Sequence, residues 1–378
     1  MTIGFLTPEF PHNATGTSGG IGSSILNLAK GLHQIGHTVK IFVYGQNNDE
    51  VVVEPEFTIY KIKNPKFKGF TRFLTQRKIQ KHINALYKNK ELDVLEVPDW
   101  TGFMSFFKPQ CSMVVKLHGS DAYFCNLDKR PVKFLNKFHE KRNLKNADKV
   151  IAVSDFVGRE TQKIFDLNFS YSVVGNAVDT QMFQPKSVEN GAPIVLYFGT
   201  LIRKKGIFEI PHIFNKVVEQ IPHAQLWLVG KDSFDIQTKS NSSWQLAKPM
   251  FVPQALKQTT YFGALPYQKM QEKIQESSVC IFPSYAEALP VSWLEAMAVQ
   301  KPVVASNIGW ATEIITPNID GFVAYPNQYE VFAQYVINLL QNKTLVQDIA
   351  KNARKKVIQN FDLQVIAKKN AEIYSTLL

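Results

Sequence analysis

The chain has 378 residues, which is too long for one ordinary hydrophobic core, so two domains are expected. Hydrophobic residues make up 45% of the sequence, which excludes a disordered or fibrous protein, and no apolar run approaches the roughly 20 residues of a membrane-spanning helix. The net charge of +11 indicates a polyanionic neighbour: a membrane surface, a nucleic acid or an anionic substrate.

The start of the sequence and the cysteines favour a cytoplasmic location. The N-terminal residues enter a strand directly, without the basic segment and apolar core of a secretory signal. Cys111, Cys125 and Cys280 share neither metal-ligand nor redox spacing, so free thiols in a reducing compartment are expected.

The first predicted elements are a strand at 3–7, a helix from 25 to 36 and a second strand at 39–44. A right-handed parallel crossover is the expected arrangement of this unit. The loop at 8–22 is rich in glycine, which permits close approach of the backbone to an anion, although a merely flexible loop is the alternative. The loop lacks G-x-G-x-x-G spacing and no acid closes the second strand, which disfavours a dinucleotide-dependent oxidoreductase.

A basic segment follows an edge strand or hairpin predicted at 51–62. Residues 61–90 contain ten basic and no acidic residues, interleaved with apolar side chains at helical spacing. One interpretation is a basic amphipathic surface on an anionic membrane, with the Phe-rich stretch 67–73 in contact with lipid. The alternative is an ordinary helix with a solvated basic face. Nucleic-acid binding is not expected, because no recognition motif accompanies the charge.

Polar residues follow the further strands predicted at 93–97, 113–117, 149–153 and 171–174. These residues are Asp99, Trp100, His118, Ser154 and Asn176. Because the carboxyl ends of parallel strands meet at one edge of a sheet, we expect a ligand site there.

A second alternating series begins after residues 178–191, which have no clear periodicity and are interpreted as a domain linker. Its predicted strands lie at 194–198, 225–229, 261–265, 279–283, 303–305 and 322–324, and helices are predicted from 328 to the end of the chain. The basic loop at 199–206 contains Arg203 and Lys205 and suits a diphosphate. The stretch 233–258 is predicted to be irregular, as a lid or insertion.

The stretch 284–309 combines a loop with the start of a helix. Pro290 is placed where the helix begins, Glu287 precedes it and Glu295 lies within it. Backbone N–H groups at the helix start suit a phosphate, namely those of Leu289, Val291 and Ser292. Phosphate and hydroxyl recognition together indicate a nucleotide sugar, whereas an ordinary capped helix is the alternative.

Several chemistries are disfavoured by missing motifs. The sequence contains no Asp-x-Asp, no His/Cys pair at metal-ligand spacing and no Gly-x-x-x-x-Gly-Lys-Ser/Thr loop. A metal-dependent transferase and a P-loop nucleotidase are therefore not expected, and neither is a bound metal or other cofactor.

Glu287 and Glu295 are separated by seven residues, which resembles the E-x7-E motif of retaining glycosyltransferases. The segment 287–306 closely resembles the corresponding part of glycosyltransferase family 4. Further pieces occur in the order of that family: the glycines at 19–22, His118-Gly119, Ser154-Asp155, the segment 176–179, Lys205-Gly206 and Asp320-Gly321. The likeness extends over nearly the whole chain.

The resemblance implies an α/β protein of GT-B fold, with two Rossmann-like domains whose parallel sheets face each other across a cleft. Residues 1–186, with a crossover helix at 362–378, would bind the acceptor, and residues 191–361 would bind the nucleotide sugar. The implied activity is retaining, metal-independent transfer of a hexosyl unit, with a UDP-sugar favoured as donor. The acceptor would be a glycan or a lipid-linked glycan in cell-surface polysaccharide synthesis, on the cytoplasmic side of the membrane. A sugar-nucleotide-binding protein without transferase activity is the alternative.

The resemblance also assigns roles to residues. Lys205 would stabilise the departing diphosphate, Glu295 would bind the ribose, Glu287 would hold hydroxyls of the transferred sugar, and His118 would approach its reacting face. Backbone groups near the phosphates would come from Gly19, Gly20, Leu289, Pro290 and Val291. A front-face reaction is implied, in which a leaving phosphate oxygen takes the acceptor proton and Glu287 is not a covalent nucleophile.

The sequence departs from the family in two places. Thr200 stands where the family often has arginine, and Arg203 is a candidate to replace that charge. Trp310 stands where a second glycine is common, so it either reshapes the pocket or packs in the core. Candidates on the acceptor side are Asp99, Trp100, Ser154 and Asn176.

Overall fold

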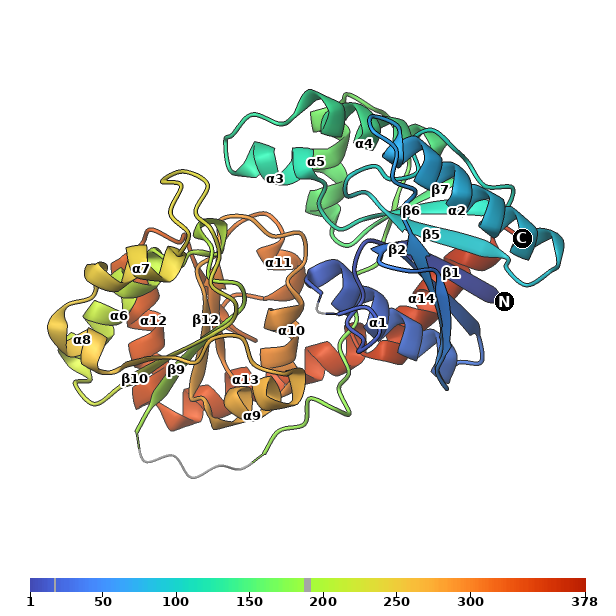
Figure 1. Ribbon diagram of the computed structural model, residues 1–378. Helices are drawn as coiled ribbons and strands as arrows, with labels where there is room; N and C mark the ends of the chain where they lie inside the picture. Colours follow the sequence, from blue (N-terminus) through green and yellow to red (C-terminus); the bar gives the residue numbers. More distant parts are fainter. Residues whose placement is uncertain (17, 187–191) are drawn as a thin grey trace. The chain divides into compact units, whose positions relative to one another are not determined.

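The computed structural model of the protein describes residues 1–16, 18–186 and 192–378 (Figure 1). The chain forms two compact units. Unit 1 comprises Met1–Ala177 and Phe361–Leu378, and unit 2 comprises Val178–Asn360. Each unit is built around an open, mostly parallel β-sheet with helices packed against it, as predicted for an α/β chain.

The chain leaves unit 1 earlier than the sequence-based boundaries at 186 and 191 place it. Residues after Val178 pack in unit 2, where the rings of Phe183 and Tyr267 lie 5.3 Å apart and the side chain of Gln271 donates a hydrogen bond to Met182 O. The end of the predicted linker, at 187–191, lies outside the described residues.

The sheet of unit 1 has the order β3-β4-β2-β1-β5-β6-β7-β8, and the pair β3–β4 is antiparallel. Its strands are β1 (Thr2–Thr7), β2 (Thr38–Gln46), β3 (Glu50–Val53), β4 (Thr58–Lys63), β5 (Val94–Pro98), β6 (Ser112–Leu117), β7 (Lys149–Ala152) and β8 (Ser172–Val173). The segment predicted as an edge strand or hairpin is therefore a hairpin at the sheet edge.

The helices of unit 1 are α1 (Gly20–Gln34), α2 (Thr71–Lys88), α3 (Asp121–Leu127), α4 (Phe134–Asn146), α5 (Asp155–Phe165) and α14 (Leu363–Ser375). Helix α1 begins earlier than its apolar periodicity predicts, because Ile21 is the single large apolar side chain among the glycines and serines at 20–24 and sets no helical period there. Helix α2 occupies the basic segment and buries one stripe that includes Ile79 and Ile83.

Helix α14 returns to unit 1 and packs against α1 (Figure 1). Gly31 makes this approach possible, since a Cβ atom at that position would lie 2.4 Å from Leu363 O. The helix also contributes polar groups to the core: the Tyr374 hydroxyl donates to Glu96 Oε2 at 2.5 Å, and Lys116 Nζ donates to Asn370 Oδ1 at 3.4 Å. Burial raises the pKa of Glu96 and lowers that of Lys116, so these partners offset a large desolvation cost.

The sheet of unit 2 has the order β11-β10-β9-β12-β13-β14, with all neighbouring pairs parallel. Its strands are β9 (Ile194–Phe198), β10 (Gln225–Val229), β11 (Thr259–Tyr261), β12 (Val279–Phe282), β13 (Val303–Ser306) and β14 (Phe322–Ala324). The predicted strand at 261–265 was wrong in its bounds: Gly263 has a φ of +71° and Pro266 follows, so the ladder ends at Tyr261.

The helices of unit 2 are α6 (Glu209–Gln220), α7 (Ser243–Ala247), α8 (Pro253–Lys257), α9 (Tyr267–Glu276), α10 (Val291–Ala298), α11 (Ala311–Ile314), α12 (Tyr329–Gln341) and α13 (Lys343–Asn360), with short 3-10 turns at Arg203–Lys205 and Lys248–Met250. Helix α6 packs against α12, and α10 packs against α13. The stretch predicted to be irregular, 233–258, contains α7 and α8. Among the described residues, no helix combines the length and apolarity needed to cross a bilayer.

Candidate active site

In unit 2 the candidate residues follow the two central strands of the sheet. From β9 the chain proceeds outward through β10 and β11, and it then returns to β12 on the other side of β9. The loops after β9 and β12 therefore diverge from neighbouring strands, and such switch points bind ligands in open α/β sheets. Lys205 lies on the first loop and Glu287 on the second.

Lys205 and Glu287 meet at this switch point. Lys205 Nζ lies 3.1 Å from Glu287 Oε1, and the Ser284 hydroxyl donates to the same oxygen at 3.1 Å. The two loops are joined by their backbones, because the amide of Tyr285 donates to Lys204 O at 2.8 Å. Gly206 has a φ of +77°, and a Cβ atom there would lie 2.0 Å from Pro283 O, so only glycine permits this approach. The cation and the carboxylate are thus held in fixed positions.

Glu295 projects from α10 into a buried position beside this pair. It is 6% exposed, and the Tyr267 hydroxyl donates to its Oε1 at 2.6 Å. Burial raises the pKa of Glu295 to about 7, against the opposing effects of the Tyr267 hydrogen bond and the charge of Lys205. A carboxyl group with this pKa changes its charge near neutral pH. In its ionised form it can accept hydrogen bonds from ligand hydroxyls.

The start of α10 presents main-chain donors. Pro290 is the N-cap residue, no side chain caps the helix, and Val291 is its first residue. The first amides of a helix have no acceptor within the helix and carry a partial positive charge. The predicted helix start is therefore placed correctly, and Leu289 directly precedes the cap.

Arg203 forms an ion pair with Asp235 and is therefore not a free cation. Its guanidinium forms two hydrogen bonds with Asp235, from Nε to Oδ1 at 2.9 Å and from Nη2 to Oδ2 at 2.8 Å. Arg203 and the hydrogen bonds of Thr238 lower the pKa of Asp235 to about 2, so the pair stays ionised at neutral pH. Thr200 contributes its carbonyl oxygen, which accepts the Tyr197 hydroxyl at 2.9 Å. Lys205 is then the cation of this loop that lies beside Glu287.

Trp310 packs in the interior of unit 2. Its side chain is 0% exposed and ranks among the largest fully buried side chains of the described residues. Of the two alternatives for this residue, packing in the core is the one the structure bears out.

In unit 1 the corresponding switch point lies between β1 and β5. Gly19 is the N-cap of α1 and Gly20 is its first residue, so the predicted glycine loop ends in a helix N-terminus. The Glu9 carboxylate occupies this position in part, because Glu9 Oε1 accepts from the amide of Gly22 at 3.3 Å.

Asp99 and His118 follow neighbouring strands of unit 1 and are joined. Asp99 Oδ1 accepts from the His118 amide at 2.9 Å, and burial raises the pKa of Asp99 to about 7. Burial and Lys116 lower the pKa of His118 to about 3, so the imidazole is neutral. In the part of the chain that the structure describes, Asp99 Oδ2 is buried without a hydrogen-bond partner. Trp100 follows with a partly exposed ring.

The other two candidates on the acceptor side have structural partners. The Ser154 hydroxyl caps α5 by accepting from the Val157 amide at 3.2 Å. Asn176 Oδ1 accepts from the Ser24 hydroxyl at 2.7 Å, which ties the end of the last strand to α1. These contacts give Ser154 and Asn176 a role in shaping the strand ends.

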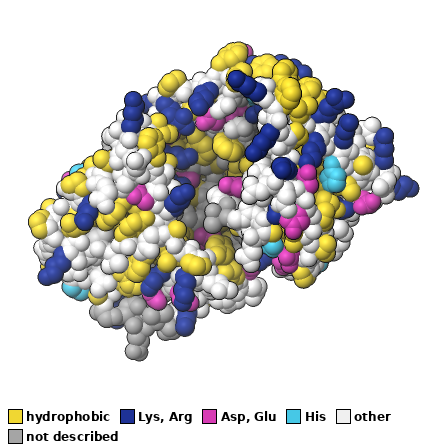
Figure 2. All heavy atoms as spheres, in the orientation of Figure 1, with side chains coloured by type: hydrophobic (Ala, Val, Ile, Leu, Met, Phe, Trp, Pro, Cys, Tyr) yellow, Lys and Arg dark blue, Asp and Glu magenta, His cyan; other side chains and the backbone are white. Residues whose placement is uncertain are grey.

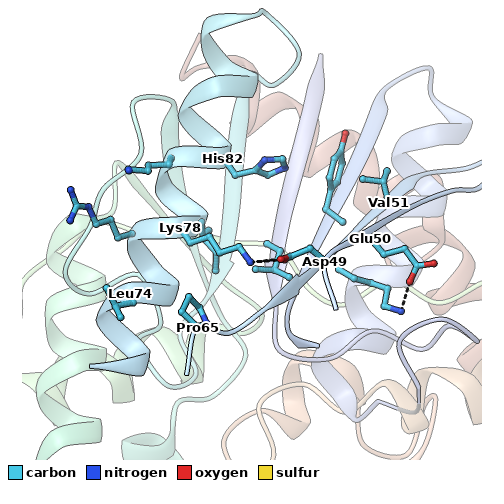
Figure 3. Close-up of a pocket in the computed structure, with 13 residues that line it drawn as sticks. Asp49, Glu50, Val51, Pro65, Leu74, Lys78 and His82 are labelled. Atoms are coloured by element: carbon cyan, nitrogen blue, oxygen red, sulfur yellow. Dashed lines mark hydrogen bonds and ion pairs between the residues drawn. The ribbon is translucent and has the colours of Figure 1, made fainter. Parts of the chain in front are cut away.

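A cavity of about 830 Å³ lies between the β3–β4 hairpin and α2 (Figure 3). Its lining includes Val51, Leu74 and His82, and it lies at the sheet edge rather than at the switch point. Lys78 and Asp49 form an ion pair across it at 2.6 Å, drawn as a dashed line in Figure 3. We therefore assign the chemistry to the strand ends and not to this cavity.

Sequence reasoning missed the side chains that position the candidates. Tyr267, Ser284 and Asp235 hold Glu295, Glu287 and Arg203, and Glu140 accepts the Asp121 and Ala122 amides at the start of α3. Ser284 directly follows a predicted strand end and could have been found by that rule. The others lie far along the sequence from their partners. In the described ranges, no group of three or more His, Cys, Asp and Glu side chains is arranged to hold a metal ion.

Each of the two parallel sheets carries candidate residues at its strand ends, and comparisons with known proteins assign such a chain to the glycosyltransferases. Residues 178–356 match the family described as Glycosyl transferases group 1, and residues 18–182 match Glycosyltransferase Family 4. The chain belongs to the glycosyltransferases of the family 4 type. The resemblance noted from the sequence is thus confirmed.

Curated relatives match all or part of the chain at low identity. An uncharacterized glycosyltransferase of Methanocaldococcus jannaschii is 24% identical, over 99% of this chain and 98% of its own. CapM of Staphylococcus aureus, a capsular polysaccharide biosynthesis glycosyltransferase, is 23% identical over 49% of this chain and 46% of its own.

Solved structures confirm the GT-B fold. Sucrose-phosphate synthase from Thermosynechococcus elongatus has a TM-score of 0.78 at 20% identity, covering 100% of this chain and 98% of its own. Anabaena HepE in complex with UDP and glucose has a TM-score of 0.74 at 18% identity, with 100% of both chains covered.

Proposed function

We propose that this glycosyltransferase moves a hexosyl unit from a UDP-sugar to a glycan or lipid-linked glycan, with retention of configuration and without a metal ion. The observation that carries the proposal is the Lys205–Glu287 pair at the switch point of unit 2, beside the buried Glu295 and the start of α10. A diphosphate needs cations and main-chain donors, whereas a sugar needs carboxylates that accept from hydroxyls.

The proposed role of Lys205 is to stabilise the transition state. As the glycosidic bond breaks, negative charge develops on the diphosphate, and a fixed cation lowers the energy of that state more than the ground state. The start of α10 adds partial positive charge to the same oxygens. With both in place, departure of the diphosphate is stabilised by this chain's own groups, and a phosphate oxygen takes the proton of the acceptor hydroxyl.

The carboxylates divide the recognition of the donor. Lys205 and Ser284 fix the position of Glu287, and we propose that its carboxylate accepts from hydroxyls of the transferred sugar. Glu295 is proposed to accept from ribose hydroxyls. The Tyr267 hydroxyl already donates to it, which orients the carboxyl group before ligand binding.

Two relatives support the choice of substrates. HepE has been solved with UDP and glucose and with UDP-glucose, and CapM acts in capsular polysaccharide biosynthesis. On the acceptor side, neutral His118 and buried Asp99 follow adjacent strands of unit 1, and we assign them to the approach of the acceptor hydroxyl. The basic segment 61–90 is proposed to favour an anionic membrane, where lipid-linked acceptors reside.

The test is a donor screen followed by turnover. The purified chain is heated with UDP, GDP and ADP and with their glucose or mannose derivatives, because a ligand bound to the native state raises the Tm. UDP compounds are expected to give the largest shift. With the best donor and EDTA, UDP release and a product whose anomeric carbon keeps the donor configuration by NMR are expected.

Three outcomes would overturn parts of the proposal. A larger shift with GDP or ADP compounds would replace the nucleotide. Loss of turnover with EDTA, restored by a divalent cation, would contradict metal independence. Donor binding with no transfer to any glycan or lipid-linked acceptor would favour a binding protein without transferase activity.

A further inference from the structure

Unit 1 exposes large apolar side chains at the start of α4. Phe134 is 80% exposed, Leu135 is 64% exposed and Phe138 is 41% exposed. Phe134 and Phe138 are four residues apart and therefore lie on the same helix face. Single exposed apolar residues need no explanation, but a contiguous group on one face marks an interaction site.

The group continues through ring contacts to the start of α2. The ring of Phe138 lies 5.3 Å from that of His139, which lies 5.1 Å from Phe106. Phe106 lies 6.0 Å from Phe73. Phe73 lies one helical turn from Phe70, another exposed side chain, whose ring is 6.0 Å from the exposed Phe67.

We call this group the aromatic surface. It comprises Phe67, Phe70, Phe73, Phe106, Phe134, Leu135 and Phe138. Three separate segments of unit 1 contribute to it: residues 67–73, which lead into α2, the loop after β5 and the start of α4. In Figure 2, hydrophobic side chains gather with Lys and Arg side chains along the upper edge of unit 1, where Figure 1 draws α4 and the start of α2.

Cations lie beside the aromatic surface on α4 and in residues 64–77. Lys137 and Lys141 each follow an exposed phenylalanine by three residues on α4, and the guanidinium of Arg142 lies 5.6 Å from the centre of the Phe106 ring. The acid within α4, Glu140, is buried and accepts the amides at the start of α3. Residues 64–77 add cations and contain no acid. The rim of the surface is therefore positive.

The basic segment 61–90 is less uniform than its composition indicates. Lys61 pairs with Glu50 at 2.7 Å and Lys78 pairs with Asp49 at 2.6 Å, so two of its cations are neutralised beside the cavity of Figure 3. The aromatic surface and its rim thus form a separate feature, which includes α4 as well as the beginning of α2.

We propose that the aromatic surface docks unit 1 onto an anionic lipid bilayer, with the phenylalanine and leucine side chains in the headgroup and acyl boundary and the lysines against lipid headgroups. An apolar centre with a cationic rim matches the chemistry of such an interface. A second copy of the chain fits less well, because a two-fold contact would place the same cations against each other. The inference deepens the lipid-linked acceptor of the proposed function, but it rests on unit 1 alone.

The experiment is co-sedimentation with two kinds of vesicle. One consists of phosphatidylcholine, and the other also contains phosphatidylglycerol. The test variant combines Phe134→Ser, Leu135→Ser and Phe138→Ser. The matched control combines Val51→Ser and Val53→Ser, which lie on β3 and are 57% and 76% exposed. The Tm and the UDP-induced shift in Tm are measured for each variant.

The native chain is expected to sediment with the anionic vesicles and much less with phosphatidylcholine. The triple variant is expected to lose binding by about tenfold or more, whereas the control keeps it. Lys137→Glu with Lys141→Glu is expected to weaken anionic binding and to reduce its salt dependence. Since these residues are exposed or half-buried and none is assigned to donor binding, the UDP-induced shift should stay unchanged.

Equal sedimentation of the native chain and the triple variant with anionic vesicles would overturn the proposal. So would absence of vesicle binding by the native chain. A monomer–dimer equilibrium that the triple variant abolishes, without vesicle binding, would assign the surface to a second copy. None of these outcomes changes the donor screen, so the failure of this inference is distinguishable from failure of the proposed function.

Discussion

Lys205 Nζ lies 3.1 Å from Glu287 Oε1, so the cation and the carboxylate assigned to the donor neutralise each other before a donor arrives. The pair keeps both charges stable in a partly buried position, where an isolated charge would be costly. A donor that brings a diphosphate and hydroxyl groups supplies each partner with a new ligand. The pair thus links the two halves of donor recognition.

Replacing Lys205 by glutamine is expected to lower turnover by about 10²–10³-fold, because a fixed cation is removed from the departing diphosphate. The measurement is UDP release at saturating donor. Lys216→Gln is the control, since Lys216 on α6 pairs with Glu330 on α12 at 2.8 Å and neither residue has an assigned role in donor binding. Turnover of Lys205→Gln within a few-fold of the native rate would refute the assignment.

Glu295 predicts a pH dependence with a definite sign. Its folded-state pKa of about 7 lies above the ordinary value of 4.5 for a glutamate, so the folded state binds more protons between these pH values. Stability contributed by the protonated form is present below about pH 4.5 and is lost as the pH rises toward 7. Glu295→Gln is therefore expected to raise the Tm at pH 8 relative to the native chain and to have less effect at pH 5, as scanning calorimetry can show.

The same residue is expected to shape donor affinity in the opposite direction. The ionised carboxylate is the better acceptor for ribose hydroxyls, so the Kd for UDP should rise as the pH falls from about 8 to about 6. Glu295→Gln should weaken binding and flatten this profile. An equally steep profile in the variant, measured by calorimetric titration, would assign the pH dependence to another group.

Two glycines of α1 give a matched pair of substitutions. Gly31→Ala is expected to destabilise unit 1 by about 2 kcal/mol, because the new methyl group meets Leu363 O at 2.4 Å. Gly20→Ala meets nothing within 4 Å and should leave the Tm unchanged. If the backbone at Gly20 lies against the diphosphate, as the resemblance to family 4 implies, this second variant should still lose turnover. Equal stability of both variants would contradict the close contact between α1 and α14.

Asp235 is expected to act as a positioning residue. Asp235→Ala removes the partner of Arg203 and loosens the turn Arg203–Lys205, so turnover should fall about tenfold or more through misplacement of Lys205. Thr238→Ala removes one hydrogen bond to Asp235 and keeps the ion pair, and it should have a small effect. Measuring kcat and KM separately distinguishes two roles for the Arg203–Asp235 pair. A positioning role lowers kcat, whereas a direct diphosphate contact by Arg203 would also raise KM strongly.

Both sheets were predictable because their strands are short apolar runs between glycine or polar residues. The strand ends then placed Asp99, His118 and Lys205 at carboxyl edges without any knowledge of tertiary contacts. Gln225–Val229 and Phe322–Ala324 were predicted with the bounds that the structure has.

Other features depend on contacts that no local pattern carries. Tyr267 reaches Glu295 across 28 positions of the sequence, and Asp235 reaches Arg203 across 32. Helix α4 was not predicted, because its exposed phenylalanines and its lysines obscure an amphipathic pattern. The same side chains that hid the helix form the aromatic surface.

Helix α14 belongs to unit 1 but follows unit 2 in the chain. Unit 1 therefore starts to be synthesised first but cannot complete its fold until after unit 2 has been made. A ribosome completes every residue of unit 2 before it makes Asn370 and Tyr374, the partners of Lys116 and Glu96. Until then the nascent unit 1 holds a buried ion pair with two partners missing and leaves the α14-facing side of α1 uncovered. Unit 2 is therefore expected to be the first protease-resistant fragment during synthesis, with unit 1 becoming resistant only once α14 has been made and has emerged.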